Sequence, residues 1–360
     1  MSDALRLPAE VIHAAELSAL AAEPGPRPPG WRLTPQAVRR FICGGSAPKF
    51  VGDPGLVDRS IVSLMGRQGL MLVGEPGTAK SLLSELLAAA ISGRSTAVVQ
   101  GSAGIIEDHL RYGWNYALLL AQGPTPQALV PSPVLSAMKA GQIVRIEELS
   151  RCAPEVQDVL ISVLSEKVLT VPELGEDHEI RARPGFNVIA TANLRDRGVH
   201  EMSSALKRRF NFETVTAISD PVAEAALVAR QLAERMADHP GAAPAPLDVI
   251  ELLVTVFRDL RTGRLADGTA VASPKAVMST AESVNVAHAA LLDATYLNPG
   301  PLGGQHIAAQ VQGVVFKDDP EDARKFRAYV DVVARDRGGR SALWRDFHRA
   351  AAAALAKSGV

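Results

Sequence analysis

Short apolar runs alternate with stretches of helical spacing over the first two thirds of the chain. The apolar runs have the length of buried strands and lie at residues 69–74, 96–99, 142–146 and 186–191. Helical spacing between them includes residues 81–90 and 154–165. This alternation predicts an α/β unit over residues 48–217 with a mostly parallel central sheet between helices, an αβα sandwich.

The remaining chain shows almost no strand pattern. Beyond Asp220, alanine, leucine, valine and arginine recur at helical spacing over residues 222–237, 247–260, 274–293, 319–334 and 341–356. A Pro/Ala-rich stretch, residues 239–246, interrupts the helices as a loop. We therefore predict an all-α second domain over residues 218–360.

The first 47 residues differ from both of these parts. A short amphipathic helix is predicted up to about residue 22, followed by a proline-rich linker at residues 23–30. Thr34 before Pro35 has the pattern of a helix cap, which predicts a helix over residues 34–41. We treat residues 1–47 as an N-terminal extension with a linker.

Composition and charge exclude several classes of protein. With 47% hydrophobic and 21% charged residues the chain is not disordered, and its formal net charge of -1 makes nucleic acid an unlikely partner for the molecule as a whole. No segment approaches the ~20 apolar residues of a membrane span, and the N-terminus lacks a signal-peptide pattern. The positions of Cys43 and Cys152 match no metal-binding motif and no redox-active CxxC motif. These features predict a cytoplasmic protein with reduced thiols.

A glycine-rich segment, GEPGTAKS, follows the first predicted strand and opens a helix. It matches the phosphate-loop pattern G-x-x-x-x-G-K-[ST] except at Ala79, a departure that costs little if Ala79 has a negative φ. Lys80 would reach the β and γ phosphates of ATP, and Ser81 would hold Mg²⁺. The alternative is an ordinary turn. The candidate nucleotide-binding residues are Gly74, Glu75, Pro76, Gly77, Thr78, Ala79, Lys80, Ser81 and Leu82.

Polar side chains follow two other predicted strands. Glu147 and Glu148 end the strand at 142–146, where Glu147 is a candidate Mg²⁺ ligand and Glu148 a candidate general base. Asn193 follows the strand at 186–191 and could hydrogen-bond both the γ phosphate and the attacking water. Arg208 and Arg209 precede Phe210; from the residues alone, a solvated helix end is the preferred interpretation of this pair.

These four elements, in this order, resemble the AAA+ ATPases. Residues 148–166, ELSRCAPEVQDVLISVLSE, are similar to the MoxR pattern of a Walker B glutamate followed by spaced arginine, proline and glutamine. Residues 168–173 and 179–193 resemble the hairpin and sensor 1 strand of that group, and alanine before the phosphate-loop lysine is also MoxR-like. The resemblance covers roughly residues 48 to 290. It implies a P-loop NTPase fold with a helical lid.

The resemblance also implies roles for single residues. Residues 74–81 would be Walker A, Glu147 and Glu148 Walker B, and Asn193 sensor 1. Arg209 is the first choice for an arginine finger that enters a neighbouring subunit, with Arg208 as the alternative, which implies a ring and usually a hexamer.

Two further residues match the pattern less closely. Lys275 stands at the sensor 2 position, where an arginine is usual. A lysine keeps the positive charge of the arginine but cannot form its two parallel hydrogen bonds to a phosphate. Val51 matches the position of an adenine-pocket residue, and a plain core valine is an equal alternative.

The resulting functional hypothesis is a MoxR-like AAA+ ATPase that hydrolyses ATP in a ring to remodel or activate a partner complex, in the manner of a chaperone. The resemblance implies a partner with a von Willebrand A domain. One alternative is a nucleotide-gated scaffold with slow hydrolysis. It is favoured by Glu147, which stands where an aspartate is usual, and by Lys275, which stands where an arginine is usual. A magnesium chelatase-like motor subunit is another, and the balanced charge disfavours a DNA-acting motor.

Overall fold

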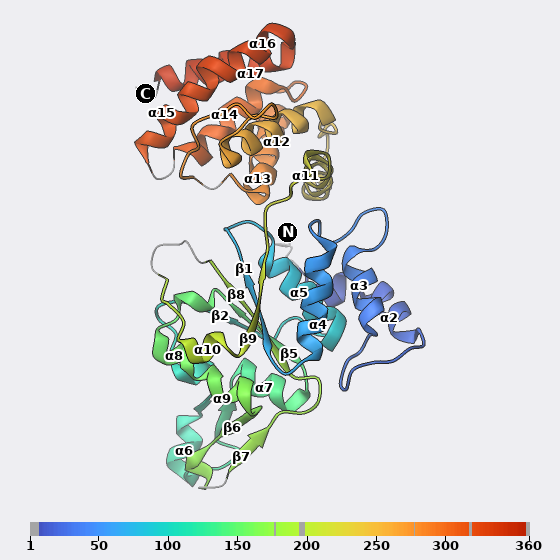
Figure 1. The fold of residues 1–360 in the computed structure, drawn as a ribbon, viewed down its shortest axis with the longest axis vertical. Helices are drawn as coiled ribbons and strands as arrows, with labels where there is room; N and C mark the ends of the chain where they lie inside the picture. Colours follow the sequence, from blue (N-terminus) through green and yellow to red (C-terminus); the bar gives the residue numbers. More distant parts are fainter. Residues whose placement is uncertain (1–6, 176–177, 194–198, 277, 317–318, 358–360) are drawn as a thin grey trace. The chain divides into compact units, whose positions relative to one another are not determined.

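The computed structural model describes residues 7–175, 178–193, 199–276, 278–316 and 319–357 (Figure 1). Contacts divide the chain into two compact units. One unit contains residues 1–75 and 79–216, and the other contains residues 217–360 together with residues 76–78. Each unit has its own hydrophobic core, so the units are described separately below.

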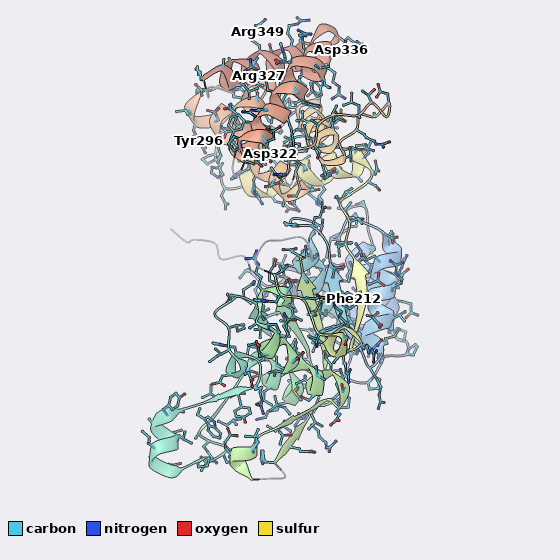
Figure 2. All side chains as sticks on the ribbon, turned by 60° about the vertical axis from the view of Figure 1, so that its left-hand side comes forward. Phe212, Tyr296, Asp322, Arg327, Asp336 and Arg349 are labelled. Atoms are coloured by element: carbon cyan, nitrogen blue, oxygen red, sulfur yellow. The ribbon has the colours of Figure 1, made fainter. Side chains whose placement is uncertain are left out.

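The first unit is built on a five-stranded parallel sheet with the strand order β2-β5-β8-β1-β9. Its strands are β1 (Gly69–Val73), β2 (Val98–Gln100), β5 (Ile143–Glu147), β8 (Asn187–Ala192) and β9 (Phe210–Thr214). The predicted parallel sheet is confirmed, but β9 was not predicted. Residues 210–214 read FNFET, so no apolar run marks the strand. On this edge strand Phe212 remains 41% exposed (Figure 2).

Helices cover both faces of this sheet. Successive side chains of a strand point to opposite faces, so the buried side chains belong to two separate hydrophobic cores. Leu70, Leu72 and Ile143 pack on the face that carries α5, while Met71 and Val144 pack on the opposite face. The alternation explains why fully apolar strands were recognisable in the sequence: both faces are covered. The helices here are α4 (Pro54–Met65), α5 (Lys80–Ser92), α7 (Pro133–Ala140), α8 (Pro154–Asp158), α9 (Leu160–Ser165) and α10 (Ser204–Lys207).

The N-terminal extension, described from residue 7, shares the core of the α5 face. It forms α1 (Ala9–Ile12), α2 (Ala14–Ala22) and α3 (Pro35–Cys43), and the predicted cap is present because the Thr34 hydroxyl accepts from the Ala37 amide at 3.1 Å. The Ala9 amide donates to the Glu85 carboxylate on α5 at 3.0 Å. Leu17, Leu33 and Phe41 are fully buried in the shared core. The extension is therefore part of the first unit.

Two antiparallel pairs of strands complete the first unit. The strands β3 (Tyr112–Trp114) and β4 (Leu129–Pro131) are joined by α6 (Tyr116–Gln122), in which no residue is buried. The hairpin expected from the MoxR resemblance is formed by β6 (Val168–Thr170) and β7 (Glu179–Arg181). Short 3₁₀ turns lie at η1 (Glu107–His109), η2 (Leu149–Arg151) and η3 (Pro172–Leu174).

The second unit is helical, as predicted. It contains α11 (Pro221–Met236), α12 (Leu247–Thr262), α13 (Thr280–Leu292), η4 (Asp293–Leu297), α14 (Gly304–Val315), α15 (Pro320–Tyr329), η5 (Val330–Ala334), α16 (Arg335–Arg340) and α17 (Ala342–Lys357), where η4 and η5 are π-helical turns. The helix expected from residue 274 begins only at Thr280, because Ser279 and Glu282 form a capping box there. In the parts of the chain that are described, no helix is apolar enough over sufficient length to cross a bilayer.

A half-buried lysine in the first unit provides a test of this packing. Lys167, at the start of the β6–β7 hairpin, lies in the left-handed region with φ 56°. Its ammonium group donates to the Asn187 amide oxygen at 3.2 Å and lies 5.4 Å from the centre of the Phe186 ring. Burial, with a smaller contribution from the charge of Arg67, lowers the pKa of Lys167 to about 8.

We expect the free energy of unfolding to rise between pH 8 and 10.5, because the unfolded state, with the ordinary lysine pKa of 10.5, binds more protons in that window. After allowance for the partial exposure of Lys167, its deprotonation accounts for a rise of about 1–3 kcal/mol in the free energy of unfolding across this window. Urea denaturation of the wild type and Lys167→Met across this range measures it. The Met variant should lose the rise, and parallel pH profiles would contradict the prediction.

Candidate nucleotide-binding site

The predicted site residues of the first unit follow the carboxyl ends of three neighbouring strands. β8 lies between β5 and β1, and all three are parallel. Gly74 follows β1, Glu148 follows β5 and Asn193 follows β8. Because the carboxyl ends of parallel strands meet at one edge, the fold brings these segments together there, where ligands bind in open α/β sheets.

The phosphate loop is held by its own lysine. Lys80 begins α5 and is only 6% exposed; its ammonium group donates to the carbonyl oxygens of Gly74 at 3.0 Å and Glu75 at 2.7 Å. The lysine thus lies across the loop at the positive end of α5, where amide groups and cation together suit a polyphosphate.

Ala79 corrects one expectation from the sequence. We expected that alanine in place of glycine would cost little free energy if the residue had a negative φ. In the structure, however, Ala79 lies in the left-handed region with φ 67°. A side chain in this region costs roughly 1–2 kcal/mol relative to the right-handed conformation. Gly77 has a similar φ of 75° at no such cost. The turn into α5 is therefore strained at the alanine that replaces the last glycine of the pattern.

Glu147 is the centre of a buried hydrogen-bond network. One carboxylate oxygen, Oε2, accepts from the hydroxyl groups of Ser81 at 2.7 Å and Thr191 at 2.8 Å. The other, Oε1, accepts from the Ser84 hydroxyl at 2.8 Å and the Arg145 guanidinium at 2.7 Å. Burial would raise the pKa of Glu147, but the bonds from Ser81, Thr191 and Ser84 and the charge of Arg145 together lower it. The carboxylate is therefore ionised at neutral pH.

This network contains three residues that the sequence analysis missed. Ser84 and Thr191 are common residues whose roles depend on the fold. Arg145 carried a signal, because it is a charged residue in the otherwise apolar run of β5. An arginine at such a position requires buried partners.

The oxygen donors that meet here fit Mg²⁺. The Ser81 hydroxyl and the Glu147 carboxylate are hard ligands of the kind that this cation prefers, and they lie 2.7 Å apart. Within the described ranges, no group of three or more His, Cys, Asp or Glu residues could hold a metal by itself. Mg²⁺ itself usually takes one or two protein ligands and completes its shell with water and phosphate oxygens.

Glu148 and Asn193 are brought into direct contact. The Asn193 amide nitrogen donates to both carboxylate oxygens of Glu148, at 2.8 and 3.0 Å, and Arg151 Nε donates to the same group at 3.3 Å. Glu148 has a φ of 56°, and its backbone amide donates to the Thr191 hydroxyl at 3.0 Å. Strained backbone is often found at functional sites, where surrounding contacts enforce it.

The two candidate arginine fingers differ in exposure. Arg209 Nε donates to the Ser165 hydroxyl and its Nη1 to the Ala205 carbonyl oxygen, both at 2.8 Å, so this side chain is anchored within its own chain. The Arg208 side chain is exposed. Arg208, the second choice from the sequence, is therefore the more accessible of the two.

The remaining two candidates are placed by the structure as follows. Lys275, in the helical unit, donates through its ammonium group to Asp319 at 2.9 Å, and its backbone amide donates to the Asp322 carboxylate at 2.7 Å. Asp322 is labelled in Figure 2. Val51, in the first unit, is partly buried in the segment before α4. Both assignments, sensor 2 for Lys275 and adenine pocket for Val51, stay predictions.

Comparisons with known proteins identify the family of the chain. A family model described as AAA domain (dynein-related subfamily) matches residues 69–210, and one described as YehL-like AAA+ ATPase C-terminal domain matches residues 222–353. YehL of Escherichia coli (strain K12) is 48% identical over 354 residues, 96% of each chain. A Staphylococcus haemolyticus protein, SH1500, is 34% identical over 145 residues, 40% of this chain and 53% of that protein. The crystal structure of NtrX from Brucella abortus in complex with ATP is similar in fold, with a TM-score of 0.50 and 14% identity over 86% of this chain and 69% of that chain.

Proposed function

This chain belongs to the MoxR-like AAA+ ATPases of the YehL type, and we propose that it hydrolyses ATP in an oligomeric ring to remodel or activate a partner protein complex. The observation that carries the proposal is the meeting of the Ser81 hydroxyl and the Glu147 carboxylate at 2.7 Å, beside a Glu148 carboxylate bonded to Asn193. The groups that we propose for phosphate binding, metal binding and water activation thus come from segments at one edge of the sheet.

Each group has a distinct task in this proposal. The loop amides and Lys80 bind the phosphates, while Ser81 and Glu147 hold Mg²⁺. When bound, Mg²⁺ neutralises charge on the β and γ phosphates. Glu148 accepts the proton of the attacking water, and Asn193 orients the Glu148 carboxylate.

The ring is part of the proposal because the resemblance to AAA+ ATPases implies that a neighbouring subunit contributes the positive charge that stabilises the transition state. An arginine from a neighbouring subunit, Arg209 or the more exposed Arg208, would supply it. The resemblance to MoxR proteins supports a hexamer and a partner with a von Willebrand A domain. A cytoplasmic location is also part of the proposal, and the two free cysteines, Cys43 and Cys152, are consistent with it.

A second candidate is a nucleotide-gated scaffold that binds ATP and assembles but hydrolyses it slowly. One contact favours it: Arg209 donates to the Ser165 hydroxyl within its own chain, which keeps this arginine from a neighbour's site. Tight ATP binding with very slow turnover by the assembled wild type would favour this candidate over the remodelling ATPase.

Lys80→Ala should weaken ATP binding by about a hundredfold, because the loop loses the cation that faces the β and γ phosphates. Titration calorimetry with ATP and Mg²⁺ measures the loss. Lys139→Ala is the matched control, since Lys139 is an exposed lysine near the end of α7 in the same unit. Equal affinity of Lys80→Ala and the wild type would mean that residues 74–81 are an ordinary turn.

A further inference from the structure

Arg145 is a charged residue in the middle of a buried strand. It lies in β5 among Ile143, Val144 and Ile146, and it is only 8% exposed. Burying a guanidinium group without partners is very costly. Its position therefore requires an environment that compensates the charge.

That environment belongs to the nucleotide site. Side chains at alternate positions of a strand share one face, so Arg145 and Glu147 both point toward α5. The guanidinium group donates through Nη2 to Glu147 Oε1 at 2.7 Å and to the Ser81 carbonyl oxygen at 3.0 Å. It also donates through Nε to the Ser84 hydroxyl at 2.9 Å and through Nη1 to the Ser95 carbonyl oxygen at 3.1 Å.

The arrangement also accounts for glutamate at a position where aspartate is usual. The two oxygens of Glu147 serve different partners: Oε1 is held by Arg145 and Ser84, and Oε2 by Ser81 and Thr191. The carboxylate can therefore pair with a buried cation while one oxygen still faces the serine that follows the phosphate-loop lysine.

We propose that Arg145 is a positioning residue of the nucleotide site, which clamps Glu147 onto Ser81 and neutralises its charge, so that ATP binding by this chain depends little on Mg²⁺. The inference rests on the proposed function and deepens it. A buried carboxylate beside the triphosphate would repel ATP unless a divalent cation lay between them. A fixed guanidinium group in the same low-dielectric surroundings supplies positive charge permanently.

The test compares ATP affinity measured by calorimetry in Mg²⁺ and in EDTA. For the wild type we expect the dissociation constant in EDTA to be within about threefold of that in Mg²⁺. Arg145→Met should raise the ratio of the EDTA value to the Mg²⁺ value by about tenfold or more, because the negative charge of Glu147 is then uncompensated. Arg145→Lys should give an intermediate ratio, since lysine keeps the charge but loses the planar fork. Arg94→Met, at an exposed arginine just after α5, is the matched control and should leave the ratio unchanged.

A double variant separates this role from a merely structural one. Arg145→Met leaves a buried charge unpaired and can unfold the protein, whereas Arg145→Met/Glu147→Gln removes both charges. The double variant should return to the wild-type ratio. A wild-type ratio above tenfold, or a double variant as dependent on Mg²⁺ as Arg145→Met, overturns the inference while leaving ATP binding itself intact. Wild-type protein that binds ATP no better than Lys80→Ala in either solution overturns the proposed function, and the inference with it.

Discussion

Glu148→Gln should leave ATP binding intact and reduce turnover by about a thousandfold, because an amide cannot accept the proton of the attacking water. The substitution preserves the shape of the side chain and its place beside Asn193, whose amide nitrogen lies 2.8 and 3.0 Å from the two Glu148 oxygens. Phosphate release at saturating ATP measures turnover, and calorimetry on the same preparation measures binding.

The neighbouring glutamate provides the contrast for this prediction. Glu147→Gln should change the Mg²⁺ concentration that turnover requires but keep most of the rate at saturating Mg²⁺, since Glu147 contacts Ser81 rather than Asn193. Glu155→Gln, at an exposed glutamate of α8, is the matched control and should behave as the wild type. If Glu147→Gln abolished hydrolysis at saturating Mg²⁺ while Glu148→Gln retained it, the two roles would be reversed.

The second large effect is expected at the arginine finger. Substitution of the finger by alanine should lower turnover by about a thousandfold without loss of ATP binding, because the pocket of each subunit stays intact while that of its neighbour is incomplete. The sequence favours Arg209, whereas the structure anchors Arg209 on Ser165 and leaves Arg208 exposed. Both Arg209→Ala and Arg208→Ala should therefore be made, each serving as the control for the other.

Mixing two inactive variants identifies a finger that acts between subunits. When the correct arginine variant is mixed with Glu148→Gln in equal amounts, half of the sites have a good base and half of those face a good finger, so about a quarter of the wild-type turnover should return. The recovery should fade on dilution below the assembly concentration. If neither mixture recovers activity where mixed rings form, Arg208 and Arg209 are a solvated helix end, as the residues alone suggested.

The sequence predicted those parts of the fold in which local pattern and tertiary environment agree. β1, β5 and β8 are buried on both faces, and their apolar runs were recognised within one or two residues. β9 was missed because one of its faces remains partly exposed and Asn211 and Glu213 interrupt the pattern. The start of α13 was placed too early because its position is decided by a cap and not by hydrophobic spacing.

The candidate site shows the same division. The loop, the Glu147–Glu148 pair and Asn193 could be placed because each follows a recognisable strand. The partners of Glu147 could not be assigned, since Ser84 and Thr191 come from elements far apart in sequence and meet only when β8 lies beside β5. The left-handed conformation of Ala79 was likewise outside the reach of residue patterns, because alanine rarely adopts it.

The N-terminal helices affect more than the surface that they cover. α1 is tied to α5 through the bond from Ala9 to Glu85, and Leu17 is buried in the core that α5 also forms. Amide hydrogen exchange in α5 should then be limited by opening of the N-terminal helices, so that both regions exchange as one cooperative unit. Because Lys80 and Ser81 begin α5, proteolytic loss of the first helices would loosen the scaffold of the phosphate loop, and nucleotide affinity would depend on a segment far from it in the sequence.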